Sequence, residues 1–319
     1  MKKYWFLVPL ALSLAAAHPA AAVSCDSQCL KRIVQQYLAQ LPLHTVGSLP
    51  VAKDAILVEN AKPTDFSQGS WALVTKVRSG QTFVDPITGQ AVFYGAVDTP
   101  NGLRSFFVRL KIVDRAIAEE EIFSRGGEPR PQDIPGAAAL PPGMPAMPPP
   151  DFSGLLEPDV LYTAEVPVER RLPRAGLIGV IRGYLKGIGE HNGKIPAFSY
   201  RCDRYSAGTK FTNNPDNPVS RGGGSCAGSL MNLKGQTPAN VRFAVVDEKL
   251  GVVVAMFIIP HAERHPQGAT NVGELFKIVD GKIRSIEEFS FVAGYPPESG
   301  FKDESWTAGP ASSAAASRS

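Results

Sequence analysis

Residues 110–123 read LKIVDRAIAEEEIF, and residues 276–289 read FKIVDGKIRSIEEF. The two stretches share seven identical residues in fourteen positions, at an offset of 276 − 110 = 166. Self-similarity at a fixed spacing indicates repeated structural units and has to be recognised before a fold is assigned. The chain is therefore predicted to contain two related halves.

Further matches upstream keep the same order along the chain. VD at 84–85 corresponds to VD at 246–247 at an offset of 162, and IVQQYL at 33–38 corresponds to VIRGYL at 180–185 at an offset of 147. Because the offset grows by 162 − 147 = 15, the second half carries an insertion, which we place around residues 212–226. Each unit is predicted to span roughly 100 residues.

Each half begins with a helical pattern and continues with β-type runs. Apolar residues recur at helical spacing in 29–41 and again in 177–188, which predicts one helix in each half. Short apolar runs such as 104–113 and 251–259 follow, separated by turn signals, and predict strands. A helix that covers one face of an antiparallel sheet gives an α+β unit.

The N-terminus has the pattern of a Sec-type signal peptide. A basic start and an apolar run precede small residues at 20–22, so we expect cleavage after Ala22 and a periplasmic or secreted protein. The apolar run is too short for a membrane anchor. A lipoprotein with Cys25 as the lipidated residue remains a weaker alternative, because Ala22 stands where such signals prefer leucine.

Four cysteines are compatible with disulfides in an exported chain, and the sequence alone allows three connectivities. We favour Cys25 with Cys29 and Cys202 with Cys226, because these pairs lie in separate halves. No histidine lies at ligand spacing from either pair, so we expect no zinc site.

The charge balance restricts the partners. The 33 basic and 30 acidic residues become 33 − 2 = 31 and 30 once Lys2 and Lys3 are removed with the signal peptide. Nucleic acids and anionic lipids are bound through a clustered basic excess, which this chain lacks. We expect a small-molecule ligand or substrate and no cofactor, nucleic acid or, after signal removal, membrane. A homodimer stays open.

The order of helix, turn and sheet, with a VxDGKI-type strand pair near the end, resembles the nuclear transport factor 2-like fold of SnoaL-like cyclases and ketosteroid isomerase. Other motifs are similar to those of a little-characterised family of secreted fungal and bacterial proteins. These motifs are C-x3-CL (25–30), VEN (58–60), GSW (69–71), DPxTGQ (85–90), CDR (202–204) and TNNP (212–215).

The resemblance implies fold class α+β with two tandem cone-shaped units, each a long N-terminal helix packed on a curved antiparallel sheet. It also implies a conical pocket for apolar small molecules in each unit. The expected organisation is a signal peptide (1–22), a first unit (23–128), a Pro-rich linker (129–168), a second unit (169–304) and a disordered tail (305–319).

The candidate site consists of polar residues of the second unit that stand where the first unit has apolar residues or no counterpart. Asp203 falls where the first unit has Ile56, and alternation along a strand places Asp203 and Tyr205 on one face, with Cys202 and Arg204 on the other. If the first face lines the pocket, Asp203 is a candidate general base and Tyr205 a hydrogen-bond donor. An ion pair of Asp203 with Arg204 or Arg201 is the simpler structural alternative.

The segment 260–266, PHAERHP, supplies further candidates. His261 is a candidate proton shuttle and Arg264 a candidate anion holder, although a solvated turn is the simpler interpretation. The flanking prolines argue against a helix that would align histidines for a metal, so no metal site is expected. The expected ligand contacts are Tyr184, Tyr200, Arg204 and Met256.

The sequence thus predicts an exported protein that binds a small apolar organic molecule and is a candidate cofactor-independent lyase, isomerase or dehydratase. A non-catalytic ligand-binding or structural module is the alternative.

Overall fold

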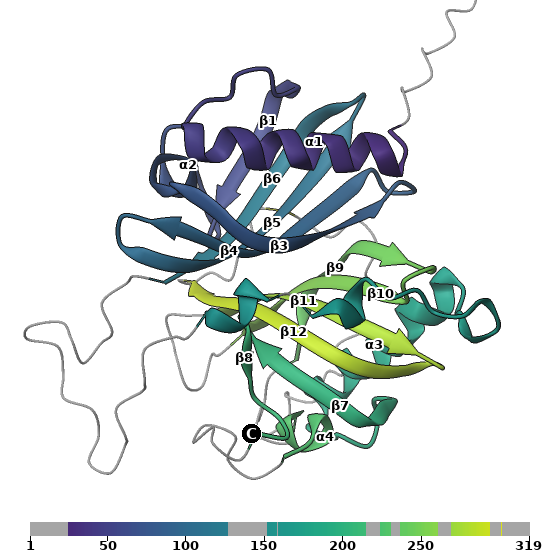
Figure 1. The fold of residues 1–319 in the computed structure, drawn as a ribbon. Helices are drawn as coiled ribbons and strands as arrows, with labels where there is room; N and C mark the ends of the chain where they lie inside the picture. Colours follow the sequence, from purple (N-terminus) through teal and green to yellow (C-terminus); the bar gives the residue numbers. More distant parts are fainter. Residues whose placement is uncertain are drawn as a thin grey trace, which may run out of the picture.

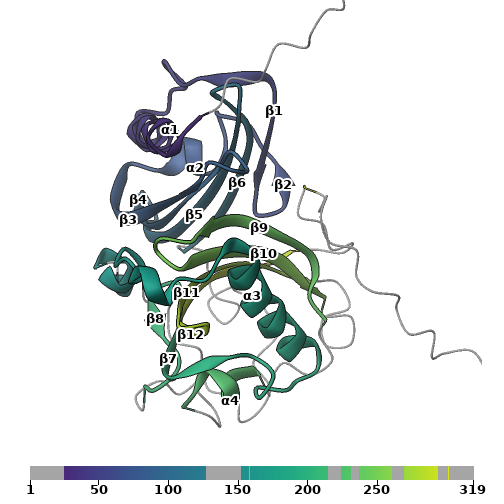
Figure 2. The same ribbon diagram turned by 90° about the vertical axis from the view of Figure 1, so that its right-hand side faces the viewer.

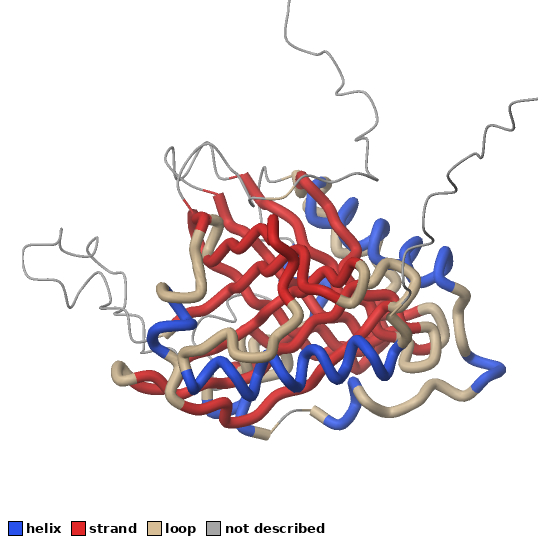
Figure 3. Tube along the Cα trace, turned by 90° about the horizontal axis from the view of Figure 1, so that it is seen from above, coloured by secondary structure: helices blue, strands red, loops and turns tan. Residues whose placement is uncertain are grey.

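The protein is mainly a β structure. The computed structural model describes residues 25–126, 152–157, 159–214, 224–230, 237–260, 269–293 and 301. Strands make up 47% and helices 24% of this part, in two six-stranded sheets with a few short helices (Figures 1 and 3). The expected α+β class, with long helices packed on antiparallel sheets, is therefore wrong. The expected signal peptide (1–22) and tail (305–319) lie outside the described residues.

The first half forms one sheet with the strand order β2-β1-β6-β5-β4-β3. Its elements are α1 (Ser27–Gln40), η1 (Leu41–Leu43), β1 (Val51–Glu59), β2 (Lys62–Pro63), α2 (Gly69–Leu73), β3 (Lys76–Asp85), β4 (Gln90–Thr99), β5 (Gly102–Val113) and β6 (Ala116–Arg125).

The second half forms a sheet with the order β8-β7-β12-β11-β10-β9, which is the same arrangement. Its elements are α3 (Arg174–Gly189), β7 (Phe198–Ser206), β8 (Thr209–Lys210), α4 (Cys226–Leu230), β9 (Ala239–Asp247), β10 (Val252–Pro260), β11 (Ala269–Val279) and β12 (Lys282–Ala293). Three short 3-10 helices precede α3: η3 (Ser153–Leu156), η4 (Val160–Tyr162) and η5 (Val168–Arg170).

The stretches that repeat in sequence form the same hairpin in both sheets. Strands β5 and β6 shift register next to Ile112, and β11 and β12 shift next to Ile278, which is 112 + 166. The backbone N–H of Ile112 donates to the carbonyl of Gly89 at 2.7 Å, and that of Ile278 donates to the carbonyl of Gly251, also at 2.7 Å. The sequence repeat thus corresponds to a repeat of topology and local geometry.

Both sheets are mixed rather than antiparallel. The first strand of each half runs parallel to the last one: β1 pairs with β6, and β7 pairs with β12. The other neighbours are antiparallel. This corrects the expectation of purely antiparallel sheets. The parallel pair arises because the chain returns to the edge of its first strand only after three hairpins.

A helix covers the outer face of each sheet. Asp26 caps α1 by accepting a hydrogen bond from the backbone N–H of Cys29 at 2.8 Å. One side of α1 is buried with Leu30 and Tyr37 fully enclosed in a core that also contains Trp71. In the second half, Tyr184 on α3 occupies the corresponding place. Apolar side chains thus fill the space between helix and sheet in each half.

The inner faces of the two sheets pack against each other. Figure 2 shows the layers in order: α1, the first sheet, the second sheet and α3. Side chains from both sheets form one shared cluster, in which Phe107 of β5 lies 5.7 Å from Phe289 of β12 between ring centroids. Residues of β4 and β10 are therefore buried nearly without interruption. Continuous apolar runs such as 252–259 are typical of strands covered on both faces. The α+β prediction expected only one face of each sheet to be covered.

Charged residues also join the halves. Arg174 at the start of α3 lies 2.7 Å from Asp85 at the end of β3. Glu121 of β6 accepts two hydrogen bonds from Arg242 of β9, at 2.6 and 2.8 Å. The ring of Phe301 lies 4.7 Å from the guanidinium carbon of Arg109.

Part of the expected linker belongs to the packed structure. Residues 129–151 lie outside the described part of the chain, but Tyr162 of η4 is buried in the shared cluster. Its hydroxyl donates to Ser285 on β12 at 3.1 Å. The stretch that leads into α3 is therefore folded against both sheets. None of the helices in the described part of the chain combines the length and the apolar character that a membrane span needs.

Candidate functional site

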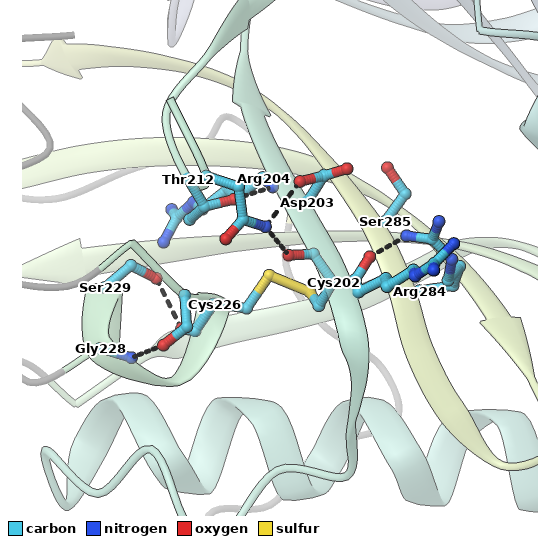
Figure 4. The surroundings of a disulfide bond; sticks show 12 residues. Cys202, Asp203, Arg204, Thr212, Cys226, Gly228, Ser229, Arg284 and Ser285 are labelled. Carbon is cyan, nitrogen blue, oxygen red and sulfur yellow. Dashed lines mark hydrogen bonds between the residues drawn. A yellow bond between two sulfur atoms is a disulfide. The ribbon is translucent and has the colours of Figure 1, made fainter. Parts of the chain in front are cut away.

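The two expected disulfides are confirmed. Cys25 is bonded to Cys29 next to α1, and Cys202 of β7 is bonded to Cys226 of α4 (Figure 4). The described residues contain no free cysteine. Disulfides persist in oxidising environments, so the protein belongs to such an environment.

Strand β7 presents alternate residues to opposite sides of the second sheet. Cys202 lies in the core beneath α3, and Arg204 points to the same side, where it reaches Glu274. Asp203 and Tyr205 alternate with them on the opposite face of the strand, the face on which Ala207 joins the shared cluster. The sequence correctly predicted that Asp203 and Arg204 lie on opposite faces of β7. The face beneath α3, however, carries Arg204 and not Asp203.

Asp203 lies in a local polar network. It pairs with Lys210 at 3.1 Å and accepts a hydrogen bond from Asn213 at 2.8 Å. Asn213 also donates to the backbone carbonyl of Cys202 at 3.1 Å. These contacts hold the segment after β8 against the disulfide. Asp203 thus forms an ion pair, as in the structural alternative, but with Lys210 instead of Arg201 or Arg204.

Tyr205 is half-buried near several acidic groups. Burial raises its pKa to about 12, and the charges of Asp203, Asp159 and Glu287 add to this effect. Lys210 lies 6.0 Å from the centre of its ring. The structure does not bring Tyr205 to the side of the sheet that faces α3.

Four polar side chains meet beneath α3 and form what we call the Arg204 cluster: Tyr184, Arg204, Glu274 and Glu288. The Nη2 atom of Arg204 donates to Oε1 of Glu274 at 3.1 Å and also to Glu288. The hydroxyl of Tyr184 donates to the same Oε1 of Glu274 at 3.0 Å. In the order given above, these residues come from α3, β7, β11 and β12. Because each belongs to a different element, the fold itself assembles the cluster.

The two carboxyl groups of the cluster differ in pKa. Burial raises the pKa of Glu274 to about 7, although Arg204 and the hydrogen bond from Tyr184 act in the opposite direction. Burial also acts on Glu288, but the charge of Arg204 and a hydrogen bond from Ser290 hold its pKa below the ordinary value. At neutral pH, Glu288 is therefore the counterion of Arg204, whereas Glu274 is close to its midpoint of titration.

One buried polar atom of the Arg204 cluster has no hydrogen-bond partner among the described residues. Oε2 of Glu274 is buried and makes no hydrogen bond within the described structure. Both side-chain hydrogen bonds of Arg204 leave from Nη2. A buried polar atom without a partner costs free energy, and such an atom calls for an explanation.

The first unit has a related but different arrangement beneath α1. Tyr37 corresponds to Tyr184, since 37 + 147 = 184, and it lies beside Trp71 with ring centroids 5.1 Å apart. Both carboxylate oxygens of the buried Glu120 accept hydrogen bonds from Nε1 of Trp71, at 3.3 and 3.1 Å. Burial raises the pKa of Glu120 to about 7 as well. Among the described residues, no arginine forms a hydrogen bond with this buried acid.

The charged residues of the second unit replace apolar residues of the first. Glu274 and Glu288 correspond to Val108 and Ile122 at the offset of 166. Arg204 corresponds to Leu57 at the offset of 147, and the strand pairings agree, because Leu57 pairs with residue 120 and Arg204 with residue 286. Glutamates inside apolar strands are thus the signal in the sequence for Glu274 and Glu288, which were not among the expected site residues.

The remaining expected site residues lie elsewhere. Tyr200 is fully exposed on β7, and Met256 is buried in the cluster between the two sheets, away from the Arg204 cluster. His261 and Arg264 lie outside the described residues. Of the expected ligand contacts, the structure brings together Tyr184 and Arg204. The described residues contain no group of three or more metal-ligating side chains.

Two polar features near the turns are structural. His44 and His191 both have a left-handed backbone conformation in the turn after the helix, and Nδ1 of His44 lies 2.6 Å from the carbonyl oxygen of Trp71. Glu59 accepts hydrogen bonds from the backbone N–H and the hydroxyl of Ser70, at 2.7 and 2.8 Å. These contacts fix the turns and the start of α2.

Comparisons with known proteins give few matches. The family model "Domain of unknown function (DUF8021)" matches residues 170–290, which contain the Arg204 cluster. No curated protein matches the chain. A crystal structure of a protein from Sphaerobacter thermophilus matches with 14% sequence identity and a TM-score of 0.28, over 36% of this chain and 94% of that chain.

Proposed function

We propose that the second unit binds a small organic molecule at the Arg204 cluster, beneath α3, and that Glu274 exchanges a proton with it. The observation that carries the proposal is the Oε2 atom of Glu274, which is buried without a hydrogen-bond partner in the described structure. A bound ligand would satisfy this atom. Perturbed acids with a specific charged partner are common at functional sites.

The cost of the Arg204 cluster also favours a function. The first unit fills the three corresponding places with Leu57, Val108 and Ile122 and still forms the same sheet. Taking charges out of water costs free energy that their mutual attraction does not fully return, and apolar replacements are often neutral or stabilising. The fold therefore does not require Arg204, Glu274 and Glu288 for its stability.

The proposed chemistry is a proton transfer without a cofactor. A carboxyl group with a pKa of about 7 is present in both protonation states at neutral pH, which suits a general acid and base. The ionised Glu274 would take a proton from a carbon next to a carbonyl group of the ligand. The same carboxyl would then return that proton to another carbon, so that atoms and charge balance in an isomerisation.

Tyr184 acts as a positioning residue in this scheme. Its hydroxyl and Nη2 of Arg204 both bind Oε1 of Glu274, which leaves Oε2 for the ligand. The site would operate in an exported protein, in the periplasm or outside the cell. The resemblance to SnoaL-like proteins and ketosteroid isomerase is in line with such chemistry, but fold alone does not determine activity. A non-catalytic binding or structural module remains the second candidate.

The test compares wild type with Glu274→Gln, and with Glu120→Gln as the matched control. Both variants neutralise a buried glutamate whose pKa is about 7, but only one lies in the Arg204 cluster. The oxidised protein is examined for co-purified ligands by native mass spectrometry and screened against small ketones, lactones and unsaturated acids. Each ligand is then incubated in D2O, and deuterium incorporation is followed by NMR.

We expect wild type and Glu120→Gln to exchange ligand protons at equal rates. In Glu274→Gln the exchange should slow by about 100-fold or more, since a general base contributes roughly 10²–10⁴-fold. Unchanged exchange in Glu274→Gln would reject the proton transfer. Altered affinity without exchange would support the non-catalytic binding protein, and equal affinity in all three proteins would place the ligand elsewhere.

A further inference from the structure

Helix α3, which covers the Arg204 cluster, is rich in glycine. Its 16 residues include five glycines, whereas α1, which covers the sheet of the first half, contains none. Glycine inside a helix loses more conformational freedom on folding than any other residue and destabilises the helix relative to alanine. The two helices occupy equivalent places on the outer faces of the sheets (Figure 2), so the difference between them lies in their sequences.

Two of the five glycines have no packing role among the described residues. A Cβ atom added at Gly179 or at Gly183 would meet no neighbouring heavy atom within 4 Å. At Gly187 the added Cβ would lie 2.7 Å from a proline ring, so glycine is needed there. The first half has Arg32 and Gln36 where the second half has Gly179 and Gly183, at the offset of 147. Close packing therefore does not account for the low helix stability that these two glycines cause.

The first turn of α3 is anchored to residues outside the helix. The Nη2 atom of Arg174 lies 2.7 Å from Oδ2 of Asp85, and the backbone N–H of Arg174 donates to the side chain of Glu248. Both glycines without a packing role lie beyond this turn, and the second one directly precedes Tyr184 of the Arg204 cluster. The helix is thus held at its start and weak where it covers the cluster.

We propose that α3 is a lid: the part after its first turn opens by local unfolding and exposes the Arg204 cluster to solvent, while Arg174 remains attached. The buried apolar side chains of α3 keep the closed form predominant. With the lid closed, Oε2 of Glu274 is buried without a hydrogen-bond partner in the described structure. Opening hydrates this atom, so the cost of leaving it unpaired favours the open form. That a ligand enters through this opening rests on the proposed function, whereas the opening itself does not.

The opening is measured by hydrogen exchange of the oxidised protein, read by mass spectrometry of peptides from α3, α1 and β10. The variants are Gly179→Ala/Gly183→Ala, in which both alanines fit, and Gln36→Gly, which places a glycine at the matching position of α1. In wild type, α3 should exchange at least about ten-fold faster than β10. The first variant should slow exchange in α3 by about ten-fold, because each glycine contributes a factor of roughly two to five. Gln36→Gly should speed exchange in α1 and leave α3 unchanged.

A second measurement determines whether the opening reaches the Arg204 cluster. Glu274 and Glu120 lie beneath α3 and α1, both are fully buried, and both have a pKa of about 7. Labelling of these carboxyl groups by a water-soluble carbodiimide with glycine ethyl ester is followed by peptide mass spectrometry. Glu274 should be labelled faster than Glu120 in wild type. Gly179→Ala/Gly183→Ala should slow the labelling of Glu274 by about ten-fold and leave that of Glu120 unchanged.

Three results would overturn the inference. Exchange in α3 as slow as in β10 would mean that α3 opens only when the whole protein unfolds. Unchanged exchange in Gly179→Ala/Gly183→Ala would mean that the glycines do not control the opening, and equal labelling of Glu274 and Glu120 would mean that the opening does not expose the cluster. None of these results decides the proposed function, which is tested separately by proton exchange in Glu274→Gln.

Discussion

Asp85 and Arg174 connect the two halves through an ion pair in which Oδ2 of Asp85 lies 2.7 Å from Nη2 of Arg174. Asp85 ends β3 in the first half and is 1% exposed, whereas Arg174 opens α3 in the second half. The same Oδ2 accepts a hydrogen bond from the backbone N–H of Val246 at 3.1 Å. One carboxylate oxygen thus anchors both a helix and a strand of the other half.

Asp85→Asn should destabilise the protein by about 1–3 kcal/mol, because a buried charge-assisted contact is lost. The free energy of unfolding is measured by urea titration of the oxidised protein. Asp98→Asn is the matched control, since Asp98 pairs with Arg78 at 3.0 Å on the surface. Surface pairs contribute less than about 1 kcal/mol, so an equal loss in both variants would contradict the role of Asp85 as an anchor.

The two disulfides should contribute unequally to stability. Cys202 and Cys226 are 24 residues apart, whereas Cys25 and Cys29 are only 4 apart. In the chain-entropy model the longer loop contributes about 3 kcal/mol and the shorter about 2 kcal/mol. The double variants Cys202→Ala/Cys226→Ala and Cys25→Ala/Cys29→Ala are compared by thermal unfolding. A larger loss in the second variant would show that native contacts of α1 outweigh the loop effect.

Stability should decrease as the pH rises from about 5 to 8. Burial raises the pKa of Glu120 and Glu274 to about 7 and that of Glu287 to about 8, while an unfolded glutamate titrates near 4.3. In this window the folded state retains protons that the unfolded state has released. Each group therefore removes up to about 1.4 kcal/mol per pH unit until its folded pKa is passed.

The pH effect is checked by urea unfolding of wild type and Glu287→Gln at intervals between pH 5 and 8. The free energy of unfolding of the variant should fall less as the pH rises, because one carboxyl group with a raised pKa has been removed. Glu165→Gln serves as the control: Glu165 pairs with Lys249 at 2.7 Å, and its pKa is lowered. It should leave the slope in this window unchanged. Parallel curves for wild type and Glu287→Gln would contradict the assignment.

Tyr184→Phe should raise the pKa of Glu274 above about 7. The hydroxyl of Tyr184 donates to Oε1 of Glu274 and thereby lowers the pKa of that carboxyl. The pKa is read from the carboxyl carbon signal of Glu274 in NMR titrations. Tyr37→Phe changes the corresponding tyrosine of the first unit and should leave Glu274 unaffected. An unchanged pKa in Tyr184→Phe would mean that the hydroxyl does not bind the ionised form.

The sequence repeat predicted the hairpins, which depend on local patterns, and the division of the chain into two halves predicted the disulfides. The match between 110–123 and 276–289 corresponds to two strand pairs with the same register shift. Cysteine pairing followed from the separation of the halves and is confirmed. The parallel pairing of β1 with β6 has no signal in the local sequence, because it joins two strands that are separated along the chain by β2, β3, β4 and β5.

The alternation of residues along β7 could not predict which face of the strand forms the candidate site. Alternation separated Asp203 and Tyr205 from Cys202 and Arg204, but both faces of the second sheet are covered, one by α3 and one by the first sheet. A period of two residues distinguishes the faces without saying which one lies under the helix. Comparing the two halves position by position would have identified Glu274, because a carboxyl there replaces Val108.

The parallel strand pair of each half also bears on the timing of folding. Val51 is joined to Ile117, which lies 117 − 51 = 66 residues later, so the sheet of the first half stays open until its last strand has been synthesised. Contacts between such distant segments slow folding, and an unfinished sheet leaves the edge of β1 free to pair with other chains. A chain that is halted before β6 is complete should therefore be prone to aggregation, whereas the finished first half can close before the second emerges.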